Sequence, residues 1–172
     1  AITPGAGLQR PAYIFGVRAA ADAGHEFPLR TSGLLIEGMR AGEISAEAMG
    51  MSFRASGRPG EIFGTVDLTG GSRHEDFDPL DTACLGRLEA RGRKVAAEAA
   101  RWLAKRDEAW KGAYISHWPL RAGIRESRRW IGGYVLTGED LLNGNRFEDE
   151  VALATWPMEF RETAKGPKLR FP

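Results

Sequence analysis

Four charged residues in one short segment are the strongest candidates for chemistry in this sequence. They are Arg125, Glu126, Arg128 and Arg129. The segment runs directly into apolar residues at 130–135, which favour burial, and charges led into a core need partners. A guanidinium can bind a carboxylate or a phosphate through two hydrogen bonds, so the arginines are candidates for gripping an anionic ligand. Glu126 would orient an arginine or, if desolvated, take part in proton transfer.

The same residues have a structural interpretation that the sequence leaves open. In an extended segment Glu126 and Arg128 share one face, while Arg125 and Arg129 point to the other. Such a pattern also suits an internal salt-bridge network that joins a sheet to a helix. Nearby, Tyr134 can offer its hydroxyl to a ligand, although a core tyrosine with a satisfied hydroxyl is the alternative.

The remaining reactive or ring-bearing residues carry weaker signals. Trp130 and Trp156 can stack on a ring system, although aromatic residues of strands usually belong to a core. The histidines are far apart and lack the spacing of metal ligands, so no metal site is predicted; they are His25, His74 and His117. The single cysteine, Cys84, excludes an internal disulfide and a cysteine-based metal cluster, and its spacing predicts a buried packing residue.

The elements that must position these residues predict an α+β fold, with an antiparallel or mixed β-sheet covered on one side by helices. Alternating apolar residues predict strands at 12–18, 49–53, 62–68, 113–118 and 151–160. Arg58-Pro59-Gly60 predicts the turn of a hairpin between the second and third of these strands. Gly132-Gly133 predicts a bend, because glycine tolerates φ > 0.

Helix signals complete the prediction. A short helix is expected near 32–40, and Thr137 with Asp140 forms a capping-box-like start for another short helix that ends at 143–144. The longest helix is expected to begin with Asp78 as its N-cap and Pro79 at the first helical position. Its apolar stripe at helical spacing consists of Cys84, Leu88, Val95, Ala99 and Trp102.

Composition fits one folded domain spanning 1–172, with 1–9 and 162–172 as connecting arms. The chain has 42% hydrophobic and 27% charged residues, which is ordinary for a globular domain. A net charge of +1 gives no reason to expect a nucleic acid or an anionic membrane as partner. No targeting segment and no long apolar run is visible, so we expect a cytoplasmic protein. The start at Ala1 rather than methionine favours a piece excised from a longer chain.

The segment 123–137 resembles the signature of the FAD-dependent oxidoreductases related to the heterodisulfide-reductase flavin subunit. The resemblance continues through 139–142, 146–149 and 156–159, and it is clear from about 78 to 160. It implies the substrate-binding (cap) domain of a flavoprotein, which covers FAD during hydride transfer from a substrate carbon. The residues that it implies as catalytic are Arg125, Glu126 and Tyr134. Those that it implies for binding substrate or cofactor are Arg128, Arg129, Trp156 and Arg161.

Two departures from the family shape these expectations. Such enzymes hold FAD in a dinucleotide fold that opens with a glycine-rich turn, and this sequence has none, so the chain alone is not expected to hold FAD. The partner implied is therefore a missing FAD-binding domain of the same polypeptide, with a small molecule as substrate. Relatives often carry a histidine where this chain has Arg161, which argues against histidine-based proton transfer there or indicates another substrate class. A free-standing binding or interaction domain of the same fold is the alternative.

Overall fold

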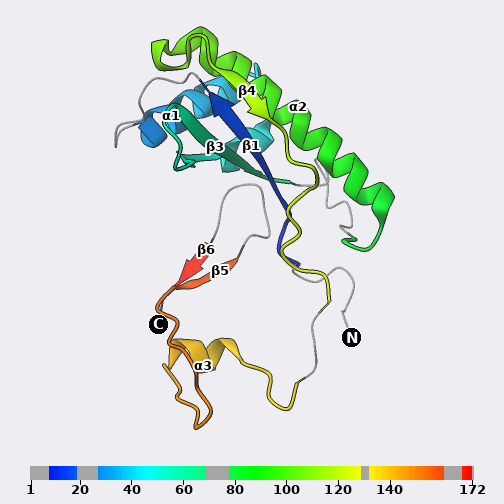
Figure 1. Ribbon diagram of the computed structural model, residues 1–172, viewed down its shortest axis with the longest axis vertical. Coiled ribbons are helices and arrows are strands. Elements are labelled where there is room, and N and C mark those ends of the chain that lie inside the picture. Colours follow the sequence, from blue (N-terminus) through cyan, green and yellow to red (C-terminus); the bar gives the residue numbers. More distant parts are fainter. Residues whose placement is uncertain (1–7, 19–26, 69–77, 129–131, 161–167, 172) are drawn as a thin grey trace.

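The computed structural model describes residues 8–18, 27–68, 78–128, 132–160 and 168–171 of the chain. These ranges contain strands and helices in the order β1 (Ala12–Arg18), α1 (Phe27–Arg40), η1 (Ala46–Gly50), β2 (Ser52–Ala55), β3 (Glu61–Asp67), α2 (Thr82–Arg106), η2 (Glu108–Trp110), β4 (Tyr114–His117), α3 (Gly138–Leu142), β5 (Met158–Phe160) and β6 (Lys168–Arg170), where η marks a 3-10 helix. The mixture of strands and helices confirms the predicted α+β class (Figure 1).

Four strands form an antiparallel sheet in the order β2-β3-β1-β4. β1 pairs with β3 along its whole length, with Arg18 opposite Glu61. On its other side β1 pairs with β4, where Gly16 lies opposite His117 and the register shifts next to that pair. The hairpin between β2 and β3 is confirmed, and its turn uses Gly60 at φ 67°, a conformation that glycine adopts at little cost.

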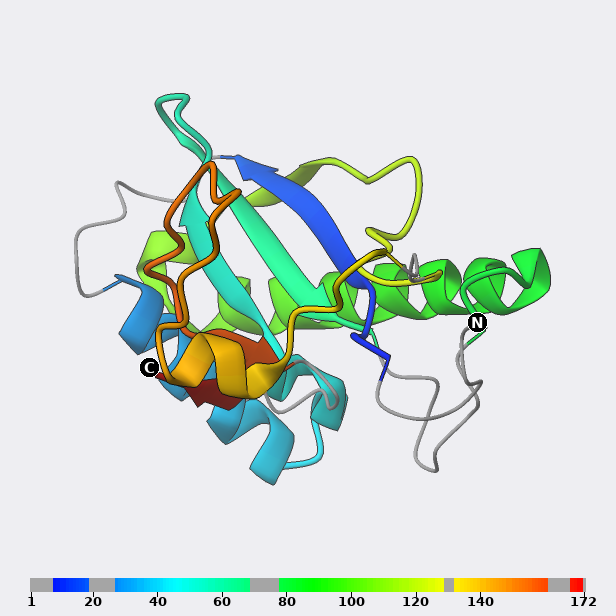
Figure 2. The ribbon, with the colours of Figure 1, turned by 90° about the horizontal axis from the view of Figure 1, so that it is seen from below.

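Helices α1 and α2 lie on the same side of this sheet (Figures 1 and 2). The side chains of β1 that the sequence predicts on one face are buried among them; they are Tyr13, Phe15 and Val17. Gly92 allows α2 to approach β1, because a Cβ atom there would come within 2.6 Å of the Tyr13 ring. Gly38 plays the same part between the helices, where a Cβ atom would meet the Trp102 ring at 2.8 Å. Burial of these apolar surfaces is what holds the layer together.

The long helix follows its predicted stripe but not its predicted start. All five predicted core residues of α2 are buried. The N-cap, however, is Asp81, whose side chain accepts a hydrogen bond from the amide of Ala83, so the prediction of Asp78 was wrong by three residues. Asp78 instead accepts from the amide of Leu80 within the turn that precedes the helix. Both aspartates are good caps, and only the tertiary position of the first turn decides between them.

Two other element boundaries also differ from the prediction. The first helix begins at Phe27 rather than near 32, and its buried residues recur every three or four positions. The predicted strand at 49–53 splits into the 3-10 helix η1 and the shorter strand β2, with Met49 half exposed and Phe53 buried. The predicted strand has apolar residues at every second position, namely Met49, Met51 and Phe53. An alternation over so few residues does not exclude a tight helical turn.

We define the sheet region as the described residues within 8–128. The described residues at 132–160 and 168–171 form a C-terminal region that is built differently. The predicted capping box of Thr137 and Asp140 is present at the start of α3, and Gly144 follows the helix at φ 62°. The predicted strand at 151–160 was too long, since only Met158–Phe160 is extended and paired. Its partner is β6, in the segment predicted to be a connecting arm. Figure 1 shows α3 and this hairpin apart from the sheet and its helices.

Candidate functional site

The sheet has one face covered by α1 and α2 and one face that no described helix covers, which we call the open face. Side chains alternate along strands, so the neighbours of the buried Phe15 and Val17 point to it. Its residues are Ile14, Gly16, Arg18, Arg54, Glu61, Phe63, Thr65, Asp67 and His117. Unlike the covered face, it carries charged groups at both ends of β3 and half-buried side chains between them. An uncovered face of this composition is suited to contact a polar ligand or another layer of protein.

At one end of the open face, Arg125 pairs with Asp67. The guanidinium Nη2 lies 2.9 Å from Oδ1 of a carboxylate that is fully buried. The preceding residues reach the sheet through paired backbone hydrogen bonds between Ala12 and Gly123. Arg125 therefore compensates a buried charge and fixes the arginine-rich segment to the end of β3, which is the internal ion pair that the sequence left open.

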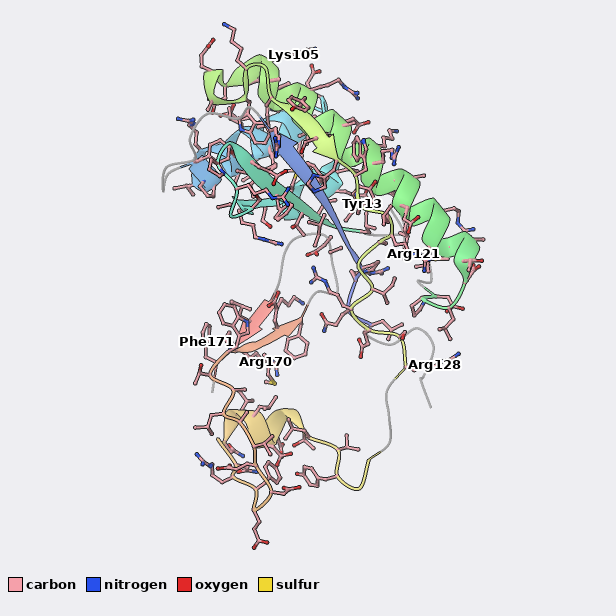
Figure 3. The ribbon with its side chains drawn as sticks, in the orientation of Figure 1. Tyr13, Lys105, Arg121, Arg128, Arg170 and Phe171 are labelled. Atoms are coloured by element: carbon pink, nitrogen blue, oxygen red, sulfur yellow. The ribbon has the colours of Figure 1, made fainter. Side chains whose placement is uncertain are left out.

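The other residues of the arginine-rich segment have different surroundings. Glu126 accepts a hydrogen bond of 2.9 Å from the backbone amide of Gln9, which ties the segment to the chain before β1. Arg128 is exposed and forms no ion pair with the residues that the structure describes; Figure 3 shows it where the chain leaves the sheet. Arg129 and Arg161 lie outside the described residues. Arg125 and Arg128 are the two predicted ligand-binding arginines that the structure describes. Of these two, Arg128 has a guanidinium that is exposed to solvent.

Tyr134 belongs to a different cluster in the C-terminal region. Its hydroxyl donates a hydrogen bond of 2.7 Å to Oδ2 of Asp140, and its ring packs against Phe147. The carboxylate of Asp140 also accepts from the hydroxyl and the amide of Thr137 and from the side-chain amide of Asn145. These donors hold the pKa of Asp140 far below its ordinary value, with the Thr137 hydroxyl as the largest cause.

This cluster decides what Tyr134 can do. The hydrogen bond to Asp140 raises the pKa of the Tyr134 hydroxyl above its ordinary value, so its proton is held by the carboxylate. Trp156 stands 73% exposed in the same region, and neither residue is brought to Arg125 by an observed contact. The structure thus places the predicted site residues that it describes in two separate groups, one at the end of the sheet and one around α3.

At the opposite end of the open face is a group that the sequence analysis did not single out. The side chain of Glu61 is 4% exposed, and its Oε1 lies 3.5 Å from Nε of Arg18 and 3.7 Å from Nδ1 of His117. Its Oε2 accepts a 2.9 Å hydrogen bond from the hydroxyl of Ser56. The Ser56 hydroxyl, followed by the charge of Arg18, lowers the pKa of Glu61 from its ordinary value.

The spacing of Glu61 and His117 in the sequence does not predict that they meet. The three histidines lack metal-ligand spacing, so the sequence assigns His117 no role. Glu61 and His117 come together because their strands, β3 and β4, pair with the two edges of β1. Alternation over 113–118 predicts His117 on the same face as Ile115, and only the register shift between Gly16 and Val17 turns His117 to the open face. No local sequence signal therefore shows this group. In the described part of the chain no group of three histidine, cysteine or acidic side chains is arranged to hold a metal ion.

Comparison with known proteins supplies the family. Residues 17–171 match the family model described as FAD dependent oxidoreductase. The chain belongs to this family. No curated protein and no solved structure matches it. The match runs through both the sheet region and the C-terminal region, so both are family structure.

FAD is the cofactor for which the family is named, and the described residues fit only a small part of what it needs. Dinucleotide folds bind the diphosphate at a glycine-rich turn between a parallel strand and a helix N-terminus. The described strands pair only antiparallel, and none of them leads into such a turn. The residues described therefore do not fit the diphosphate of FAD. Among them there is also no helix with the length and apolar character to span a membrane.

Proposed function

We propose that this chain is the substrate-side (cap) domain of an FAD-dependent oxidoreductase, with its open face turned toward the reacting centre. The observation that carries the proposal is a sheet of which the described helices α1 and α2 cover one face, in a chain that matches an FAD-dependent family and has no described dinucleotide fold. When bound, FAD supplies the acceptor for a hydride from a substrate carbon. The diphosphate of that FAD would be held by another domain of the same polypeptide.

The residues of this chain would act by binding and by excluding water. The open face would cover a small-molecule substrate and keep bulk water from it. Arg128 would bind an anionic group of the substrate or cofactor, because a guanidinium with open donors suits a carboxylate or phosphate. Arg125 would position this segment through Asp67 rather than contact the ligand.

The C-terminal region supports a second domain as partner. Its large apolar side chains are exposed in the described chain; among them are Val135, Leu136, Val151, Leu153, Trp156 and Phe171. Figure 3 places Phe171 and Arg170 on the hairpin side of the molecule, away from the long helix. A soluble domain rarely leaves so many such side chains uncovered unless another surface packs on them. The closer relation to heterodisulfide-reductase flavin subunits and the cytoplasmic location belong to the same proposal.

The test compares two neighbouring arginines in the flavin-loaded enzyme. Arg128→Ala should lower kcat/KM for substrate oxidation by about 30- to 1000-fold, the equivalent of about 2–4 kcal/mol of charge-assisted binding, with the melting temperature nearly unchanged. Arg125→Ala should instead lower the melting temperature, because it removes the partner of a buried carboxylate. Arg129→Ala is tested beside them, since Arg129 is the other predicted ligand cation of this segment.

Arg87→Ala is the control, because Arg87 is exposed on α2 and should change neither quantity. If Arg128→Ala and Arg129→Ala both keep wild-type kinetics while melting several degrees lower, the segment is scaffolding and the site assignment is wrong. A chain that is stable, complete and never associated with flavin would favour the alternative of a free-standing interaction domain.

A further inference from the structure

The imidazole of His117 lies in a place that the sheet keeps open for it. Gly16 stands opposite His117 across β1 and β4, and a Cβ atom on Gly16 would come within 2.0 Å of Cε1 of the ring. Any other residue at position 16 would therefore push the imidazole away. Because Gly16 is in the middle of a paired strand, where glycine costs stability, its value here is the space that it leaves.

Three neighbours fix the ring once it lies over Gly16. The Phe63 ring meets it edge-on, with centroids 5.7 Å apart, and Arg54 stacks on the far side of Phe63. Nδ1 faces two oxygens, with Glu61 Oε1 at 3.7 Å and Ser116 Oγ at 3.3 Å. A surface histidine that only contributes charge would not need three neighbours to fix its orientation.

The surroundings also determine which nitrogen is free to react. The Glu61 carboxylate can only accept, so its charge favours the neutral tautomer with the proton on Nδ1 and a lone pair on Nε2, while the Ser116 hydroxyl suits either tautomer. The side chain of His117 is 47% exposed while that of Glu61 is 4% exposed, so the carboxylate is behind the ring and the ring is toward solvent. A histidine oriented by a buried carboxylate in this way is the arrangement of a general base.

We propose that His117 is the base that accepts a hydroxyl proton from the substrate, that Glu61 is its positioning residue, and that the substrate class is therefore alcohols oxidised at a C–OH carbon. The proposal rests on the proposed function, in which the open face covers the substrate. In the step, the substrate O–H bond breaks and the proton moves to Nε2, while the electron pair left on oxygen forms the second C–O bond as a hydride leaves the same carbon. The flavin implied by the family would accept that hydride when it is bound.

The charges around the ring suit this transfer. The imidazolium that forms is compensated by Glu61, and the other charged groups near the pair are Arg18 and Arg58, whose charges act on Glu61, and Arg54 beyond Phe63. A substrate hydroxyl loses its proton readily as its carbon becomes a carbonyl, so a histidine suffices as the acceptor. Oxidation of a C–C bond would need a base for a carbon acid, for which a half-exposed imidazole is poorly suited.

The first test needs neither flavin nor substrate. In the 172-residue chain with 15N-labelled histidine, NMR of the neutral ring should show His117 as the Nδ1–H tautomer in the wild type. Glu61→Ala should shift the population toward the Nε2–H tautomer, which predominates when no acceptor faces Nδ1. An Nε2–H tautomer in the wild type would overturn the assignment of Nε2 as the base.

The second test uses the flavin-loaded enzyme under anaerobic conditions with a panel of polyols and 2-hydroxy acids, and follows bleaching of the flavin. His117→Ala should slow flavin reduction about 100-fold or more with FAD content unchanged. Added imidazole should restore much of the rate, because the variant leaves a ring-sized space over Gly16 beside Glu61. Gly16→Ala, which keeps the histidine but removes its space, should lose rate and gain nothing from imidazole.

Tyr114→Phe on the same strand serves as the control and should reduce at the wild-type rate. If His117→Ala reduces at that rate and ignores imidazole, His117 is not the base, while the proposed cap function stands. If the wild-type flavin is reduced by none of the panel but by a substrate without a hydroxyl, the substrate class is wrong. If the wild-type polypeptide that includes the proposed FAD-binding domain holds no flavin at all, the proposed function itself fails, and this inference with it.

Discussion

Side chains are buried for different reasons in the two regions of this molecule. The sheet region buries a continuous set of apolar side chains, with Trp110, Leu103 and Val17 fully inside. In the described C-terminal region the one buried side chain is the carboxylate of Asp140, and large apolar side chains such as Trp156 face outward. Apolar burial stabilises the first region by itself. Hydrogen bonds organise the second region locally, and its apolar surface predicts a partner.

The comparison matters for function because the candidate groups divide along the same line. Arg125, Glu61 and His117 belong to the packed sheet region, whereas Tyr134 and Trp156 belong to the C-terminal region. Precise chemistry needs groups held by packed elements, and the sheet region offers them. Recognition of another domain needs exposed apolar area, and the C-terminal region offers that.

The largest expected effect contrasts a tryptophan of each region. Trp110 stacks on Phe27, meets Phe53 edge-on and donates its indole N–H to Thr31, so Trp110→Ala should cost about 3–5 kcal/mol of unfolding free energy. Trp156→Ala should change it by no more than about 0.5 kcal/mol in the 172-residue chain, since that side chain is exposed. Urea unfolding measures both. Equal losses of unfolding free energy in the two variants would contradict the claim that apolar burial stabilises the sheet region and not the C-terminal region.

A smaller and local effect tests the hydrogen-bonded cluster around α3. The pKa of Asp140 is lowered in the folded chain, so its ionisation stabilises this cluster above the ordinary aspartate pKa of about 4. That stability should be lost progressively as the pH falls below about 4 and toward the lowered folded value. Asp140→Asn should open the cluster already at neutral pH and make it insensitive to acid.

Hydrogen exchange of the amides of Thr137 and Asn145 follows this cluster directly, with the amides of β1 as the internal reference. We expect protection to fall in acid in the wild type and to be low at every pH in Asp140→Asn. The amides of β1 should be alike in both proteins at neutral pH. Unchanged protection in Asp140→Asn would mean that packing, and not the carboxylate, holds α3.

The smallest effect is expected from removing the C-terminal region altogether. A chain that ends at Arg128 keeps every described apolar residue of the sheet core and the Arg125–Asp67 pair. It should unfold in one cooperative transition, with a melting temperature within about 3 °C of the full 172-residue chain. Loss of the sharp transition in calorimetry would show that the sheet region depends on the segment that follows it.

The sequence predicts the sheet region well because its signals are local and repeated. The alternation at 12–18 and the apolar stripe of the long helix each recur over several turns or residue pairs, and burial follows them in the structure. The boundaries that failed depend on tertiary position, as with Asp81 rather than Asp78 at the helix start. Both residues carry the same local signal, so only packing distinguishes them.

The candidate site could be predicted only in part, for a related reason. The arginine-rich segment stands out because four charges adjoin apolar residues, and the structure does place it at the end of the sheet. The pairing of Glu61 with His117 joins residues far apart in sequence through a third strand, which no local pattern shows. Tyr134 and Asp140 are six residues apart, so their contact is a local one. That they form a cluster separate from the sheet follows only from the structure, in which the residues around them are exposed.

The central claim is that this chain contributes a substrate-side surface, while the diphosphate of FAD is held elsewhere. Its most direct test is a titration of the 172-residue chain with FAD, followed by flavin absorbance and fluorescence after gel filtration. We predict a colourless protein that retains no FAD at micromolar concentration, because the described strands provide no dinucleotide site. A yellow protein with one FAD per chain would contradict the claim and place the cofactor on these residues.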